Sequence, residues 1–149
     1  MKGIVMLKAK DLMTREVIVV KKETPIYEAV QLLMEREITG IPVVEDDMTL
    51  VGIITEIDVL KLFYDKGSAE EKTVRNFMTQ PALSFDENDS LLDVCDFLMK
   101  NLVRRVPITS EGKLVGIISV PDIIRYTLEI RRECVVPSRR TLAAGDNDE

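Results

Sequence analysis

Apolar side chains recur along the chain with two periods, and each period predicts one kind of element. Between residues 24 and 35 they stand at i, i+3, i+4, i+7 and i+8, which forms one stripe along an amphipathic helix. Thr24 and Pro25 come first, so we expect the helix to start with threonine as its N-cap and proline at its first position. The residues of the stripe are Ile26, Ala29, Val30, Leu33 and Met34.

Shorter apolar runs follow this helix and predict a pair of strands. Residues 41–44 and 50–54 are rich in β-branched side chains, and the polar residues 45–49 between them predict a turn. Pro42 stands near the beginning of the first run, where a missing N–H does least harm. A second helix is expected over residues 55–64.

The same order of elements returns later in the chain, which indicates an internal repeat. KDLMTREVIVV (10–20) is matched by RNFMTQPALSF (75–85), and LVGIIT (50–55) is matched by LVGIIS (114–119) after one residue is lost in the turn. The second copy predicts a helix from about Ser90 and a last helix from Ser119 to about Arg131. The second apolar stripe consists of Leu91, Val94, Cys95, Leu98 and Met99.

A helix–strand–strand–helix unit cannot cover both faces of its own sheet, so we expect the two copies to cover each other. The predicted fold class is α/β (α+β): tandem repeats with two small β-sheets, each flanked by helices, pseudo-two-fold symmetry and a cleft between the halves. We expect the first repeat with its lead-in over residues 1–66, a linker over 67–73 and the second repeat over 74–132. Residues 133–149 read as a disordered tail.

Composition narrows the function classes. The net charge is -6 with no basic stripe, which argues against nucleic-acid binding. The chain has no histidine, and Cys95 and Cys134 match no zinc or redox spacing. No apolar run is long enough to span a bilayer, and the early charges of the N-terminus do not fit a signal peptide. We therefore expect a cytoplasmic protein with no membrane partner. Because histidine is the commonest general base, its absence also leads us to expect that the protein is not an enzyme.

The first candidate site is the T/S-x-x-D pattern that follows the second strand of each repeat. It pairs Thr55 with Asp58 in one copy and Ser119 with Asp122 in the other. One interpretation is a helix capping box. The other is a nucleotide site, because a helix N-terminus offers free amides to a phosphate and a carboxylate one turn later can bind ribose hydroxyls. The two interpretations do not exclude each other.

Two further sets recur in both copies. Gly40, Ile41 and Pro42 correspond to Arg105, Val106 and Pro107; the apolar residue before each proline could form a wall against a purine, or could simply be core. Arg104 and Arg105 could bind a phosphate or form surface ion pairs. Thr14 and Thr79 precede extended segments whose backbone could read the edge of a base, although ordinary turn chemistry also explains them.

Taken together, DLMT (11–14), TP (24–25), GIPVV (40–44) and LVGIITEID (50–58) resemble a cystathionine-beta-synthase (CBS) domain, and the second copy repeats the pattern over 76–122. The resemblance covers about residues 8 to 130 and implies a CBS pair, or Bateman module. It implies two sites in the cleft for adenosine-containing ligands such as AMP, ADP, ATP or S-adenosylmethionine. It also implies flat homodimers.

The resemblance assigns roles to these candidates. Thr55, Asp58, Ser119 and Asp122 would contact phosphate and ribose; Ile41 or Val106 would flank the base; and Arg104 and Arg105 would reach phosphate. Because Thr39 and Gly40 stand where the second copy has two arginines, the two sites should differ, and Pro121 removes one amide from the second.

The leading hypothesis is a stand-alone regulatory module that signals the state of an adenosine nucleotide to an unknown protein effector. It needs no obligatory cofactor, and Mg²⁺ would accompany bound ATP. The alternative is a structural dimerisation or interaction module with no small-molecule ligand, because capping also explains the T/S-x-x-D patterns.

Overall fold

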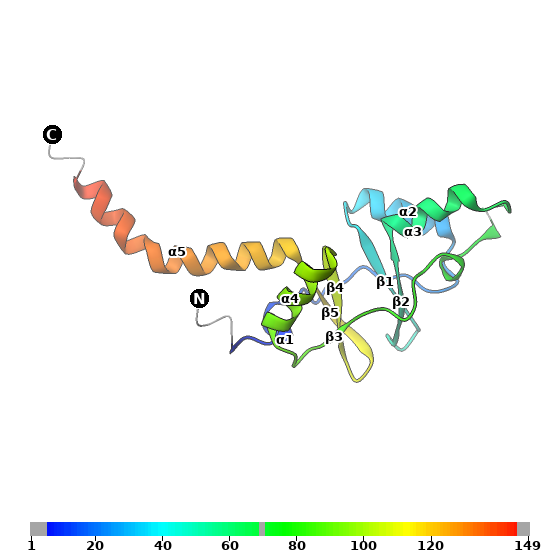
Figure 1. Cartoon of the computed structure of the whole chain (residues 1–149), viewed down its shortest axis with the longest axis horizontal. Helices are drawn as coiled ribbons and strands as arrows, with labels where there is room; N and C mark the ends of the chain where they lie inside the picture. Colours follow the sequence, from blue (N-terminus) through cyan, green and yellow to red (C-terminus); the bar gives the residue numbers. More distant parts are fainter. Residues whose placement is uncertain (1–5, 69–70, 146–149) are drawn as a thin grey trace.

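Two antiparallel hairpins form the centre of the molecule (Figure 1). β1 (Gly40–Val44) pairs with β2 (Leu50–Thr55), and β4 (Arg105–Ser110) pairs with β5 (Lys113–Ser119). β3 (Phe85–Asp86) adds a short parallel strand to β4. Both hairpins come from the β-branched runs, and both contain a register shift just after the fourth residue pair, one pair beyond the proline.

Helices cover the outer faces of both sheets. The computed structural model describes residues 6–68 and 71–145, and within them each repeat has a short helical turn and a longer helix before its hairpin and a helical segment after it. The helices are α1 (Ala9–Leu12), α2 (Ile26–Glu35), α3 (Glu56–Val59), the 3₁₀ segments η2 (Leu60–Tyr64) and η4 (Val74–Asn76), α4 (Leu91–Asn101) and α5 (Val120–Gly145). This arrangement confirms the predicted fold class.

Two helix ends differ from the sequence-based expectation. Pro25 rather than Thr24 occupies the N-cap position of α2, because the Thr24 Oγ1 is engaged as the acceptor of the Lys21 N–H at 2.9 Å. α5 continues to Gly145 instead of ending near Arg131. The expected disordered tail is therefore helical over residues 133–145, which include the helix formers arginine, leucine and alanine. Residues 146–149 of that expected tail lie outside the described residues.

The lead-in segment of each repeat packs into the core of the other repeat. Ala9 and Met13 are buried against α4, β4 and β5, in the core of the second half. Val74, Phe77 and Met78 are buried against α2, β1 and β2, in the core of the first half. Each half therefore borrows apolar side chains from a segment that precedes the other half in sequence, and this exchange holds the two halves together.

The contacts between the halves follow a pseudo-two-fold axis. Thr14 pairs with Ile117, and the equivalent Thr79 pairs with Ile53. On the axis itself, Thr49 pairs with Lys113, its own counterpart in the repeat. The hairpin turns meet there through backbone bonds from the Leu50 N–H to the Gly112 carbonyl and from the Leu114 N–H to the Met48 carbonyl.

Candidate functional site

Two cavities lie between the halves, and the internal repeat relates one to the other. The first has a volume of about 310 Å³ and the second about 180 Å³. Most residues that line the second cavity have a counterpart in the repeat that lines the first. These pairs, with the first-cavity residue given first, are Thr79 and Thr14, Leu83 and Ile18, Val103 and Ile38, Arg105 and Gly40, Pro107 and Pro42, Ile53 and Ile117, and Thr55 and Ser119. The expected cleft is thus present as two related cavities.

Hydroxyl groups form the polar end of the first cavity. Thr55 ends β2 and caps α3: its Oγ1 accepts the Asp58 N–H at 3.3 Å, while Asp58 Oδ2 accepts the Thr55 N–H at 3.0 Å. Asp58 also accepts the Thr55 hydroxyl at 3.0 Å, the Thr79 hydroxyl at 3.1 Å and the Lys61 ammonium at 2.8 Å. The predicted capping box is therefore present, and its carboxylate also bonds to the lead-in of the second repeat.

Asp58 lies behind the first cavity and does not line it. Only 3% of the residue is exposed, and Thr55 and Thr79 border the cavity in front of it. The carboxylate therefore orients the two hydroxyls. The carboxylate oxygens accept four donors in this structure, and the contact between Asp58 and a ribose stays a prediction.

The second copy of the motif is more open. Asp122 accepts the Ser119 N–H at 3.1 Å and an Arg125 N–H at 3.1 Å, and its side chain is 18% exposed. It borders a third, polar hollow of about 250 Å³. Thr14 lines both this hollow and the second cavity, so the hydroxyl of Ser119 and the carboxylate of Asp122 lie at neighbouring openings.

The two arginines occupy different positions. Arg104 lines the first cavity, whereas Arg105 lines both cavities and is half-buried. Burial lowers the pKa of Arg105, while the nearby Asp122 carboxylate raises it and the Arg104 charge lowers it. The buried Arg105 Nε has no hydrogen-bond partner among the described residues. A buried, unpaired guanidinium N–H is a donor that an anion can satisfy.

Ile41 does not take the position that the resemblance implied. It is fully buried in the core beneath α2 and lines neither cavity. Successive strand residues point to opposite faces, so Gly40 and Pro42 face the other half while Ile41 faces the helix. Val106, the equivalent residue, is also in the core but borders the first cavity.

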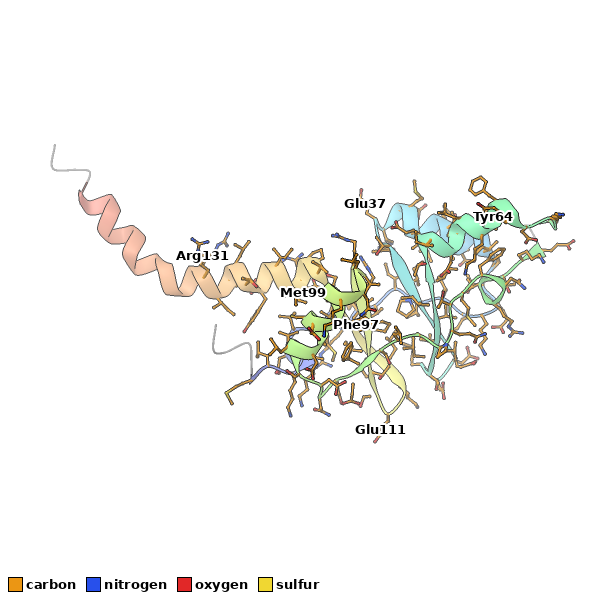
Figure 2. All side chains as sticks on the ribbon, in the orientation of Figure 1. Glu37, Tyr64, Phe97, Met99, Glu111 and Arg131 are labelled. Atoms are coloured by element: carbon orange, nitrogen blue, oxygen red, sulfur yellow. The ribbon has the colours of Figure 1, made fainter. Side chains whose placement is uncertain are left out.

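Sequence reasoning missed most of the apolar lining. Phe97 of α4 borders the first cavity near the middle of the molecule (Figure 2), and Phe85 packs edge-on against its ring with centroids 5.4 Å apart. Leu83 and Val103 complete this wall, as Ile18 and Ile38 do in the second cavity. The sequence pattern that could have identified these wall residues is an apolar residue at the same repeat position in both copies, outside the recognised motif.

The described residues contain neither a membrane-spanning helix nor a cluster of metal-binding side chains. No helix there combines the length and apolarity required to cross a membrane. The same part of the chain holds no group of three or more histidine, cysteine, aspartate or glutamate side chains that could bind a metal ion.

The repeat boundaries, the exchanged lead-ins and the paired cavities agree with the match to a family model. The model for the CBS domain matches the chain twice, at residues 9–65 and 74–129. The chain belongs to the CBS domain family. The chloroplastic CBS domain-containing protein CBSX1 of Arabidopsis thaliana is 33% identical to it over 142 residues, which cover 76% of this chain and 60% of CBSX1. The chain thus spans less than two thirds of that relative.

Solved CBS pairs share the fold. The structure of CBSX2 of Arabidopsis thaliana in complex with AMP superposes with a TM-score of 0.76 and 32% identity, covering 84% of this chain and 98% of CBSX2. The CBS domain pair of MJ0100, in complex with 5′-methylthioadenosine and S-adenosyl-L-methionine, superposes with a TM-score of 0.69 and 27% identity, covering 81% of this chain and 95% of the pair.

Proposed function

We propose that the two cavities bind adenosine-containing ligands, among them AMP, ADP, ATP and S-adenosylmethionine, and that their occupancy regulates a partner protein. The observation that carries this proposal is the pair of repeat-related cavities, each with a strand-end hydroxyl at a helix N-terminus and a guanidinium at its border. Similar CBS pairs have been solved with AMP, methylthioadenosine and S-adenosylmethionine, which supports this ligand class.

The first cavity has the chemistry that a nucleotide requires. Its volume of about 310 Å³ lies at the lower end of the usual range for ligand sites, about 300–1,000 Å³. Apolar side chains, including Phe97 and Leu83, would cover the purine faces. The Thr55 and Thr79 hydroxyls would bond to ribose or phosphate, and Arg104 and Arg105 would neutralise the phosphate charge.

The second cavity differs from the first in its size and in the charge of its lining residues. It is smaller and has Arg105 as its only cation among the described lining residues, alongside Glu16. Ser119, Thr14 and the neighbouring Asp122 supply hydroxyls and a carboxylate for a ribose. We therefore propose that the first cavity prefers ligands with more phosphate charge, and that the second accepts ligands of lower negative charge.

Isothermal titration calorimetry with AMP, ATP and S-adenosylmethionine tests the proposal. We expect Arg104→Gln to weaken AMP and ATP binding in the first cavity by about tenfold, since a charged hydrogen bond contributes roughly 1.5–3 kcal/mol. Asp122→Asn should weaken binding in the second cavity. Asp96→Asn, which alters a surface carboxylate paired with Lys100, is the matched control. Absence of heat with all three ligands would contradict the proposal.

We also propose a homodimer, built on an apolar stripe that each repeat exposes. Leu60 and Tyr64 of η2 are 53% and 86% exposed, and Ile124 and Leu128 at the same repeat positions of α5 are 56% and 51% exposed. Tyr64 lies on the outer side of its helix (Figure 2). Two equivalent stripes related by the pseudo-two-fold axis suit a second copy of the chain, because a symmetric dimer presents the same patch from both subunits.

A module without a small-molecule ligand is the second candidate function. The bonds within the Asp58 capping box favour it, because they satisfy that carboxylate with no ligand present. Purified protein extracted with acid and examined at 260 nm distinguishes the two, because the chain has no tryptophan to mask a purine. Co-purified purine supports the nucleotide site. No purine together with no calorimetric binding supports the interaction module.

A further inference from the structure

One side chain, Arg105, stands between the two cavities. It is the first residue of β4, opposite Ser119 on β5, and it lines both cavities. Gly40, its counterpart in the repeat, is the other residue shared by the two linings, and it has no side chain to offer. The repeat places two equivalent residues, Gly40 and Arg105, between the cavities. Only the second half therefore supplies a cation at this central position.

The charges around Arg105 make it important to both cavities. Among the described residues, the first cavity is lined by one further cation, Arg104, and the second by none. The buried Nε of Arg105 has no partner in the described part of the chain, and Asp122 is the acidic group whose field acts on it. None of the ion pairs between described residues involves Arg105, so its guanidinium is available to an anion on either side.

We propose that this single guanidinium serves both cavities, so that an anionic ligand in one cavity weakens anion binding in the other. The inference rests on the proposed function. A guanidinium drawn toward a phosphate in the first cavity leaves the second without a cation, and the reverse holds when the second cavity fills first. Since coupling between sites is reciprocal, each ligand must weaken the other by the same factor.

The absence of tryptophan makes each cavity separately observable. Leu83→Trp places a fluorophore at the first cavity, where Leu83 is 65% exposed, and Ile18→Trp places one at the equivalent position of the second. Titration of each variant with AMP gives the occupancy of one cavity at a time. We expect both curves to be broader than a single hyperbola, with affinity at least fivefold lower once the other cavity is occupied.

Arg105→Gln, made in both tryptophan variants, is the decisive change. It should weaken AMP at both reporters by at least fivefold and restore simple hyperbolic curves, while having less effect on the uncharged ligand adenosine. Arg104→Gln is the matched control: it should weaken AMP at the Leu83→Trp reporter only and leave the coupling in place.

Three results would overturn the inference. Loss of AMP affinity at only one reporter in Arg105→Gln would show that the guanidinium serves one cavity. Broad curves that persist in Arg105→Gln would assign the coupling to repulsion between the bound ligands. Simple hyperbolic curves for both reporters in the wild-type background would show that the cavities are independent. A failure of the proposed function looks different, because neither reporter nor calorimetry would then respond to any adenosine ligand.

Discussion

At the scale of single residues, the two aspartates of the repeated motif have the same local structure but different environments. Asp58 is 3% exposed and bonds to Thr55, Lys61 and Thr79, the last from the other repeat's lead-in. The side chain of Asp122 is 18% exposed and bonds to Ser119 and Arg125 on its own helix start. Asp58 is therefore a structural link between halves, whereas Asp122 remains more accessible to a ligand.

We expect Asp58→Ala to lower the free energy of unfolding by about 2–4 kcal/mol, because it removes a helix cap and the buried acceptor of the Thr55 hydroxyl, the Thr79 hydroxyl and the Lys61 ammonium. Asp122→Ala should cost only about 1 kcal/mol, the usual value for a lost cap. Urea unfolding of both variants measures the difference. Equal losses would contradict the assignment of Asp58 as the link between halves.

At the scale of elements, each lead-in crosses a hairpin at a glycine. A Cβ built on Gly52 of β2 would lie 2.8 Å from the Thr79 carbonyl oxygen, and one built on Gly116 of β5 would lie 2.5 Å from Met13 Sδ. The close approach lets Thr79 and Ile53 exchange backbone hydrogen bonds. Glycine at these two positions is what allows the lead-in of one repeat to lie against the sheet of the other.

Gly52→Ala should therefore lower the free energy of unfolding by about 1–3 kcal/mol, the typical cost of overpacking, because a backbone carbonyl cannot move aside as a side chain can. Gly40→Ala in the neighbouring strand is the control. Its Cβ would meet its nearest atoms at 3.4–3.6 Å, so we expect a change within about 0.5 kcal/mol. Thermal or urea unfolding compares the pair, and a Gly52→Ala protein as stable as Gly40→Ala would refute the steric argument.

At the scale of the whole molecule, the exposed apolar stripes and the cavities lie on different parts of the surface. The stripes run along η2 and the start of α5, on the outer helices, while the cavities lie between the halves. Association and ligand binding should therefore be separable by substitution.

Leu60→Asp should shift the protein from dimer to monomer, because it places a charge in an apolar stripe that would be desolvated on association. Leu60 is 53% exposed, so the monomer should keep its fold. Leu83→Asp changes a leucine outside the stripes that is 65% exposed, and it should leave the dimer intact. Analytical ultracentrifugation gives the masses, and a monomeric wild type would exclude the proposed dimer.

Ligand binding should stabilise the whole molecule, because both cavities include residues of both halves. AMP at 100 times its dissociation constant should add about 2.7 kcal/mol to the free energy of unfolding for each occupied site. Differential scanning fluorimetry should therefore show a rise in Tm that grows with AMP concentration. A Tm independent of AMP, ATP and S-adenosylmethionine would count against the sites.

The fold class and the site region were predictable from the sequence, because helix and strand periods record which face of each element is buried. The offset between Met13 and Met78, or between Gly52 and Gly116, was enough to indicate two equivalent units and a cleft between them. The T/S-x-x-D capping boxes were also predictable, because a cap depends on residues only three positions apart.

Only the tertiary structure decided how the halves use these residues. The exchange of lead-ins, the burial of Asp58 behind Thr79, and the place of Arg105 between two cavities all depend on contacts between segments far apart in sequence. Local periodicity carries no record of such contacts. The same motif therefore forms a buried link in one repeat and an accessible group in the other, because packing across the axis sets the environment of each copy.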